Sequence, residues 1–311
     1  MIKIKNVGAQ ILGETLFEKF TLAINSGDRI GIVGPNGSGK TTLLKIIAGI
    51  HESYEGSIHY EHERVGYLPQ DIEYADHDTV QTFIAAVPQA RRIKVLAEVG
   101  LSSISQDTRV KELSGGQKRR LALARTLGNG PTFLLLDEPT NHLDRATIEW
   151  LEEFIQNFRG GVILISHDRS LLDSVVHKIL EINPRDQVIH TYAGNYSSYL
   201  IERAKRDRLQ NEAHDRQQRE KKRIEEWLAR KRQEATVHPD PSKGRMIRAK
   251  VKYLQREILD KEIHRAGPQK KIHGAHLEGE VARAKLMCRV TDIAKSYGTK
   301  SVLKKVSFEV R

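Results

Sequence analysis

The chain has 311 residues, which favours two domains at about 150 residues each, and its formal net charge is +11. Hydrophobic residues make up 39% of it, and its longest apolar runs, such as Phe83–Val87, fall far short of the roughly 20 residues of a membrane-spanning helix. The start lacks the apolar core of a secretory signal, and the single cysteine, Cys288, excludes an internal disulfide and a cysteine-based zinc site. We therefore expect a soluble, cytoplasmic protein without a membrane partner.

The charge is unevenly distributed along the chain. Residues 1–199 carry 21 Lys and Arg against 24 Asp and Glu, whereas residues 200–286 carry 24 against 14. Such asymmetry indicates a polyanionic partner such as nucleic acid, although a solvated helical spacer has the same composition.

Residues 1–195 alternate β-rich and helical stretches. Two stretches, Ile2–Val7 and Phe20–Asn25, alternate apolar and polar residues, which predicts an antiparallel start. Short apolar runs between helical stretches then predict an α/β domain with a mostly parallel core sheet. The expected strands are Arg29–Val33, Thr132–Leu136 and Gly161–Ile165, and the expected helices are Thr41–Ala48 and Gly116–Leu127.

A long antiparallel helical hairpin is expected after the α/β domain. Residues 197–234 contain no Gly or Pro, which predicts one helix of roughly 55 Å. A turn is predicted at Pro239, Asp240, Pro241 and Gly244. The second helix carries an apolar seam of Ile247, Val251, Leu254 and Ile258, which should face Ile224, Trp227 and Leu228.

A weak internal repeat appears at an offset of 286 residues. The equivalent of Lys40 would fall near position 326, so the chain is expected to be a fragment of a longer protein or the product of a truncated gene. We expect three parts: residues 1–196, a linker hairpin at 197–286 with its tip near 235–244, and the first strands of a second copy at 287–311. Ile4, Val7, Leu16, Phe17, Phe20, Leu22 and Ile24 match Val290, Ile293, Val302, Leu303, Val306, Phe308 and Val310.

A phosphate-binding loop follows the strand Arg29–Val33. Its glycines allow backbone N–H groups to surround phosphates at a helix N-terminus. Lys40 is expected to neutralise the β- and γ-phosphates, Thr41 to ligate Mg²⁺ and Thr42 to reach the α-phosphate. The loop consists of Gly34, Pro35, Asn36, Gly37, Ser38, Gly39, Lys40 and Thr41.

An acidic pair ends the apolar strand before residue 139. Asp137 is expected to hold Mg²⁺ through water and Glu138 to polarise the attacking water. Gln70 would complete the Mg²⁺ shell, and His167 would bond to the γ-phosphate. A solvated strand end and a structural histidine are the plainer interpretations of the same residues.

A second anion site is expected at the helix that begins near residue 116. Its residues Ser114, Gly115, Gly116 and Gln117 would face a nucleotide held by another domain, since the first loop already binds one set of phosphates. One domain then supplies two half-sites, so this chain alone should hydrolyse nucleotide weakly.

Together these motifs resemble the ATP-binding cassette superfamily over residues 1–195. Its ABC-F branch, which has two cassettes and no membrane domains, is indicated by residues 138–144 (EPTNHLD), residues 192–197 (YAGNYS) and the charged linker. The resemblance implies ATP and Mg²⁺ as cofactors, adds Asp144 to the nucleotide-binding residues, and implies a ribosome partner, with the hairpin reaching rRNA and peptidyl-tRNA. It leaves open a translation factor or a protein that protects ribosomes from antibiotics.

Two other functions use the same chemistry. An ATPase subunit of a membrane transporter needs neither the basic hairpin nor a second cassette start, and a coiled-coil DNA-repair ATPase would separate the phosphate loop from the acidic strand. The sequence departs from the cassette pattern at the residue expected to stack on the adenine base. Cassettes commonly have an aromatic ring there, but this position is Ile11, whereas the repeat has Tyr297. The partner that completes the two half-sites would be a second cassette in a longer chain or a head-to-tail copy of this chain.

Overall fold

The computed structural model describes residues 1–264 except 12, 142, 238–240 and 262, together with residue 266 and the strand residues 288–297 and 300–310. Only the backbone is described at 237, 241–243, 288–297 and 300–310. The chain divides into two compact units, Met1–His264 and Arg265–Arg311. The stretch of the predicted linker from 267 to 286 lies outside the described residues, and its boundaries at 196 and 286 stay predictions.

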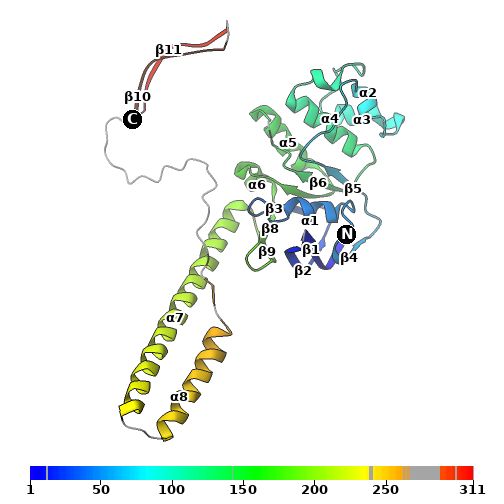
Figure 1. The fold of residues 1–311 in the computed structure, drawn as a ribbon. Helices are drawn as coiled ribbons and strands as arrows, with labels where there is room; N and C mark the ends of the chain where they lie inside the picture. The colour runs from blue at the N-terminus through cyan, green and yellow to red at the C-terminus, as the bar shows by residue number, and fades with distance from the viewer. Residues whose placement is uncertain are drawn as a thin grey trace. The chain divides into compact units, whose positions relative to one another are not determined.

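A six-stranded sheet forms the centre of the first unit (Figure 1). Its strands are parallel except β9, which pairs antiparallel with β8. The parallel strands β3, β6 and β7 are buried at every residue, because other elements cover both faces of the sheet. Their carboxyl ends therefore meet at one edge. The order is β5 (Val65–Leu68), β6 (Phe133–Asp137), β7 (Gly161–Ile165), β3 (Arg29–Val33), β8 (Lys178–Asn183) and β9 (Val188–Ala193).

A second sheet and one helix cover one face of this central sheet. The sheet has the order β2-β1-β4 and is antiparallel, as its alternating residues predict. Alternate residues of the central strands, such as Ile30 and Ile32, pack in a core with Phe17, Leu43 and Ile47. The elements are β1 (Ile2–Ile11), β2 (Glu14–Ile24), β4 (Glu55–Tyr60) and α1 (Lys40–Ile47).

The opposite face of the central sheet packs against a second core. Leu134, Leu136 and Leu164 point to this side and join Leu123 and Leu151 from the covering helices. The mostly parallel α/β fold predicted from the sequence is thereby confirmed. The remaining elements of this part are α2 (Val80–Phe83), α3 (Gln89–Glu98), the 3₁₀ turn Val110–Glu112, α4 (Gly115–Leu127), α5 (Arg145–Asn157) and α6 (Arg169–Val175).

The helical hairpin is also present. The long helix α7 (Tyr196–Val237) pairs with α8 (Pro241–Tyr253), which continues into a π-helical turn at Leu254–Leu259. Ile224, Leu228 and Ile258 are buried between the helices, with Trp227, Ile247 and Leu254 packed against them.

Two details of the predicted hairpin are wrong. Val251 is 37% exposed and lies outside the buried seam. From Ile247 to Val251 the α-helix turns through about 400°, which is more than one full turn, so the Val251 side chain lies at the edge of the buried stripe. Pro241 and Gly244 lie in α8 and not in the turn. Proline is favoured in the first helical turn, where its missing N–H has no partner to lose. Of the other predicted turn residues, Pro239 and Asp240 lie outside the described residues.

The first turns of α7 are attached to the α/β part through two carboxylates. Asp173 of α6 accepts hydrogen bonds from the backbone N–H (2.7 Å) and the hydroxyl (2.5 Å) of Ser197. Glu181 of β8 is 4% exposed and accepts hydrogen bonds from Tyr192 and Arg206. Tyr199 also donates to Glu181, and Arg203 forms an ion pair with it at 3.0 Å.

The described residues of the second unit form an antiparallel pair of strands, β10 (Cys288–Tyr297) and β11 (Lys300–Val310). Cys288 pairs with Val310 and Tyr297 with Lys300, as Ile2 pairs with Ile24 and Ile11 with Glu14 in the first unit. The register shifts also fall at equivalent positions after adding 286. The repeat in sequence is therefore a repeat in backbone structure.

Candidate nucleotide-binding site

The phosphate-binding loop connects β3 to α1. Gly39 has φ of 93° at the N-cap of α1, and a Cβ at Gly34 would lie 2.8 Å from the carbonyl oxygen of Ile182. The Lys40 Nζ donates to the carbonyl oxygens of Gly34 and Pro35, both at 3.0 Å. Burial lowers the pKa of Lys40, and the nearby carboxylates of Glu138 and Asp137 oppose that shift. The loop is thus folded around its own lysine.

Two of the three predicted magnesium ligands, Thr41 and Asp137, lie in contact. The Thr41 hydroxyl donates to Asp137 Oδ1 at 3.3 Å, and the Tyr67 hydroxyl donates to Asp137 Oδ2 at 3.2 Å. Burial, reinforced by the Asp137 charge, raises the pKa of Tyr67, so this hydroxyl stays protonated as a donor. Gln70 follows β5 directly, but its side chain is exposed, and its role as a ligand stays a prediction.

Glu138 follows β6 in an unusual conformation. Its φ is 46°, in the left-handed region that costs a non-glycine residue about 1–2 kcal/mol. His167 Nε2 lies 3.2 Å from Glu138 Oε1, whereas Oε2 is buried with no hydrogen-bond partner. Burial raises the pKa of Glu138, and His167 opposes the shift. An unpartnered carboxylate oxygen of this kind is suited to accept a hydrogen bond from water.

The residues of the second predicted anion site form a capping box at the start of α4. Ser114 Oγ accepts from the Gln117 N–H at 3.2 Å, and Gln117 Oε1 accepts from the Ser114 N–H at 2.9 Å. A Cβ at Gly116 would lie 2.7 Å from Thr147 Oγ1, so only glycine lets α4 approach α5 here. Asp144 caps α5 by accepting from the Thr147 N–H. The nucleotide-binding roles of Ser114, Gly115, Gly116, Gln117 and Asp144 stay predictions.

Sequence reasoning did not identify Arg119 of α4. This side chain is 6% exposed and donates to main-chain carbonyls at the end of β6 and after β5. Its neighbour Arg120 lies 4.4 Å over the ring of Trp150 instead. Two adjacent arginines offer no sequence signal that tells them apart, so only the fold distinguishes them.

The residues present fit a magnesium-bound nucleoside triphosphate. Magnesium prefers oxygen ligands and is usually bound through only one or two carboxylates. The Thr41 hydroxyl and the Asp137 carboxylate, which lie in contact, supply such a set. Ser38 Oγ and Glu138 Oε2 are buried polar atoms without hydrogen-bond partners in the described part of the chain, and both belong to the predicted site. The close backbone at Gly34 leaves no room for a side chain.

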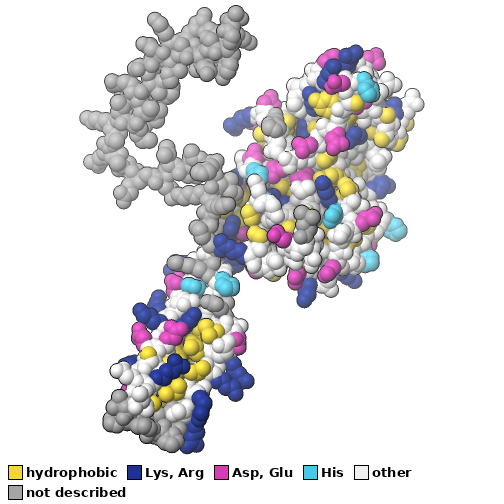
Figure 2. Space-filling view, in the orientation of Figure 1, with side chains coloured by type: hydrophobic (Ala, Val, Ile, Leu, Met, Phe, Trp, Pro, Cys, Tyr) yellow, Lys and Arg dark blue, Asp and Glu magenta, His cyan; other side chains and the backbone are white. Residues whose placement is uncertain are grey.

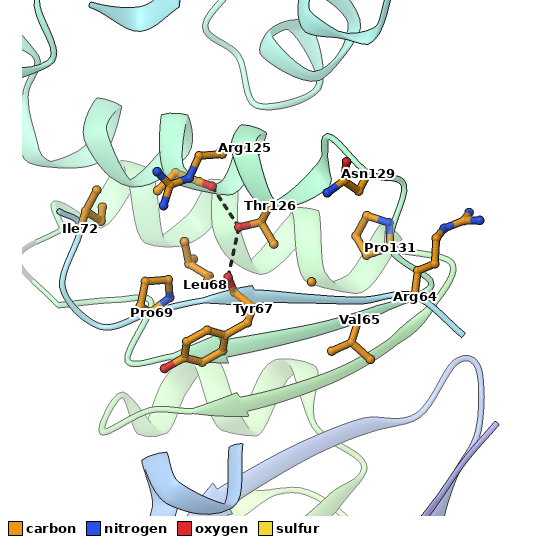
Figure 3. A pocket seen from close by; sticks show the side chains of 12 residues that line it. Arg64, Val65, Tyr67, Leu68, Pro69, Ile72, Arg125, Thr126, Asn129 and Pro131 are labelled. Carbon is orange, nitrogen blue, oxygen red and sulfur yellow. Dashed lines mark hydrogen bonds between the residues drawn. The ribbon is translucent and has the colours of Figure 1, made fainter. Parts of the chain in front are cut away.

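A pocket between β5 and α4 lies apart from these residues (Figure 3). Thr126 of α4 donates to the carbonyl oxygens of Ala122 and Tyr67, while the Tyr67 ring points away from α4. None of the predicted site residues lines this pocket, although Tyr67, whose hydroxyl donates to Asp137, does.

Comparison with known proteins gives the family. Residues 17–141 match a family model described as ABC transporter, and residues 182–273 match a second model of the same description. The Escherichia coli (strain K12) energy-dependent translational throttle protein EttA is 32% identical over 95% of this chain and 59% of its own length. ABC transporter F family member 2 of Arabidopsis thaliana is 36% identical over 64% of this chain and 30% of its own length. The chain belongs to the ABC-F branch of the ATP-binding cassette superfamily.

Other relatives agree with this assignment. The Bacillus subtilis ABC transporter ATP-binding protein YfmR is 33% identical over 74% of this ABC-F chain and 43% of its own length. The chain thus spans less than two thirds of these relatives. A metal-chelate-type ABC transporter in an inward-facing conformation has a TM-score of 0.55 and 24% identity over 62% of this chain and 82% of its own. That likeness concerns the fold. Among the described residues no helix has the length and apolarity needed to span a bilayer.

Proposed function

We propose that this ABC-F chain binds ATP with Mg²⁺, hydrolyses it in partnership with a second cassette, and acts on the ribosome. The observation that carries the catalytic part is the buried Glu138 carboxylate. One oxygen lies 3.2 Å from His167 and the other has no partner, at the end of the strand that also holds Asp137. Magnesium, when bound by Thr41, Asp137 and Gln70, would neutralise phosphate charge.

The residues divide the chemistry between them. Lys40 exchanges its loop carbonyls for phosphate oxygens, and the backbone N–H groups of residues 36–42 surround the phosphates. Glu138 accepts a proton from the attacking water, which its raised pKa favours by making it a stronger base. His167 holds the carboxylate from one side and reaches the γ-phosphate from the other. Asp144 adds a further nucleotide contact, and the start of α4, residues 114–117, contacts the nucleotide that a second cassette holds.

A second cassette is part of the proposal. Ser114 caps α4 and would contact a nucleotide held by another cassette, in a longer chain or in a head-to-tail copy. The chain alone should then bind ATP but turn it over slowly. A specific activity that does not change with protein concentration, in a chain shown to be monomeric, would contradict this.

Two substitutions test the catalytic part. Lys40→Ala should abolish binding of a fluorescent ATP analogue with Mg²⁺, because it removes the compact charge between two phosphates. Glu138→Gln should retain binding and lose hydrolysis by about 10²–10⁴-fold, under conditions in which the wild-type chain turns over. Glu202→Gln, an exposed glutamate on α7, is the matched control. Unchanged affinity in Lys40→Ala, or a rate within about twofold of wild type in Glu138→Gln, would reject these roles.

The hairpin supports the ribosome as partner. Its apolar seam occupies one strip, and Lys and Arg side chains lie on both sides of this strip, with some Asp and Glu side chains among them (Figure 2). Cations gathered in this way repel one another, and a phosphate backbone relieves the repulsion. The name of EttA connects that relative to translation. Structured RNA, both rRNA and peptidyl-tRNA, is the ligand we propose. Exposed cations include Arg216, Arg219, Lys222, Arg223, Arg230, Arg232, Arg245, Arg248 and Lys252.

Co-sedimentation with ribosomes over a salt series tests this part. Reversing Arg245, Arg248 and Lys252 to Glu should reduce pelleting and flatten its salt dependence, while ATP affinity stays unchanged. Reversing three exposed cations of the α/β part matches the change in net charge and should have the smaller effect; these are Lys5, Lys19 and Lys111. Equal pelleting of the hairpin variant and wild type would reduce the hairpin to a spacer. Drug susceptibility of cells that express the chain separates antibiotic protection from a translation role.

A further inference from the structure

Arg119 uses its whole hydrogen-bonding capacity on main-chain carbonyls. A guanidinium group has five N–H donors and no acceptor. Nε donates to Pro139 O at 3.2 Å, and Nη2 donates to Asp137 O at 3.0 Å and Glu138 O at 2.5 Å. Nη1 donates to Pro69 O at 2.8 Å and Gln70 O at 2.9 Å. Five donors thus meet five acceptors, and the positive charge is placed among backbone dipoles.

The five carbonyls belong to two segments far apart in sequence. One is the end of β6, which carries Asp137 and Glu138, and the other is the loop after β5, which carries Gln70. Arg119 itself belongs to α4, whose N-terminus Ser114 caps. One buried side chain therefore connects three parts of the proposed site.

The Glu138 main chain makes two other backbone hydrogen bonds: its N–H donates to Ile165 O at 3.0 Å, and its carbonyl oxygen accepts from the Asn141 N–H at 3.3 Å. Its φ of 46° is nevertheless unfavourable for a residue with a side chain, and Pro139 follows it. A residue in such a conformation persists only when its surroundings determine it. The carbonyl groups of Asp137, Glu138 and Pro139 accept hydrogen bonds from the Arg119 guanidinium, which thereby constrains the backbone that directs the Glu138 side chain.

We propose that Arg119 is a positioning residue for ATP hydrolysis: its five-donor guanidinium holds the Glu138 backbone and the Gln70 loop in the one arrangement that the reaction requires. The inference rests on the proposed function, since Glu138 is the base in it. Charge alone does not suffice for this role, because an ammonium group has three donors and lacks the planar fork.

The first test compares Arg119→Met and Arg119→Lys with Arg125→Met, a control on the exposed side of the same helix (Figure 3). Both Arg119 variants should lower kcat by about 10–100-fold, since a small misplacement of a catalytic group has effects of this size. KM for Mg-ATP should change by a much smaller factor than kcat, because Lys40 donates to the carbonyls of its own loop, Gly34 and Pro35, and not to the segments that Arg119 holds. A kcat retained in a folded Arg119→Met variant, or a loss confined to KM, would overturn the proposal.

Chemical rescue separates positioning from general stability. Arg119→Ala leaves a space lined by the same five carbonyls, and millimolar guanidinium ion should fill it and restore part of kcat in a saturable way. Ammonium ion at equal concentration should not. Restoration by both ions, or by neither in a variant that binds Mg-ATP normally, would contradict the requirement for a five-donor group.

Hydrogen exchange supplies a readout that does not depend on turnover. In Arg119→Met, exchange should increase in residues 138–141 and 69–71 together, and remain unchanged in α1, while Arg125→Met leaves all three segments as in wild type. If Glu138→Gln hydrolyses ATP as fast as wild type, the proposed role of Glu138 fails, and the exchange result alone decides whether Arg119 holds both segments. Unchanged exchange in either segment of Arg119→Met would reject the inference.

Discussion

The attachment of α7 to the sheet through Glu181 gives a sharp prediction about stability. The Glu181 carboxylate is 4% exposed and has four partners on two elements: the hydroxyls of Tyr192 and Tyr199, and the guanidinium groups of Arg203 and Arg206. Glu181→Ala removes the nearer of the two carboxylates that pair with these arginines; Asp207 lies farther away, 3.8 Å from Arg203 and 3.7 Å from Arg206. The variant leaves two half-buried cations and two buried hydroxyl donors without their shared acceptor.

The size of the effect follows from the burial of the partners. Removing one member of a buried ion pair costs roughly 3–5 kcal/mol. The side chains of Arg203 and Arg206 keep 33% and 32% of their surface exposed, so water compensates them in part. We therefore expect the lower end, a loss of about 3 kcal/mol in the free energy of unfolding, or about 6–12 °C in Tm for a unit of this size.

Thermal and urea unfolding of the full chain, followed by far-UV circular dichroism, measure this loss. Glu202→Ala on the exposed side of α7 is the control and should change the free energy of unfolding by less than about 0.5 kcal/mol. Tyr192→Phe, which deletes one donor and keeps the ring, should cost about 1 kcal/mol and stays measurable if Glu181→Ala does not fold. A loss in Glu181→Ala equal to that of the control would refute the reasoning.

Three further perturbations test the site and the hairpin. Glu138→Gln should be more stable than wild type at neutral pH, because a carboxyl group whose pKa is raised on folding destabilises the folded state above that pKa. The difference in urea midpoint between the two proteins should shrink as the pH falls through the raised pKa. A variant that is less stable than wild type at pH 7 would contradict this prediction. Gly116→Ala should destabilise the chain by about 1–3 kcal/mol through contact with Thr147, and Thr147→Ala in the same chain should restore part of that in calorimetry, whereas absence of any rescue would reject the contact as the cause. Ile258→Ala should cost about 2–3 kcal/mol in the hairpin and speed hydrogen exchange in α8 without changing ATP affinity; equal exchange in both proteins would argue against the seam.

The buried strands were predictable from the sequence almost to the residue. Arg29–Val33 and Gly161–Ile165 match β3 and β7, because a strand covered on both faces is a continuous apolar run between polar or glycine residues. The long α7 was predictable as well, since no Gly or Pro interrupts it. Here local composition and fold agree.

The features that sequence reasoning missed depend on contacts between distant residues. Arg119 bonds to carbonyls 18 to 50 positions away, and a carbonyl group carries no information about residue type. The left-handed φ of Glu138 is imposed on a residue type that does not favour it. The Val251 side chain lies outside the seam because of a small rotation around the helix axis, which a heptad pattern in the sequence does not reveal. These are the positions where tertiary structure overrides local preference.

The anchoring of α7 has a mechanical consequence. Its contacts with the sheet unit fall within the first turns, from Ser197 to Arg206, whereas the helix continues to Val237. At 1.5 Å per residue the free length is about 46 Å, against an anchored base of about 14 Å. The helix is therefore a lever with a ratio of about three, and a tilt of about 5° at its base displaces the far end by about 4 Å. A change of a few tenths of an ångström at β8 or α6, if transmitted by Glu181 or Asp173, becomes a movement of about 1 Å at the end of the hairpin.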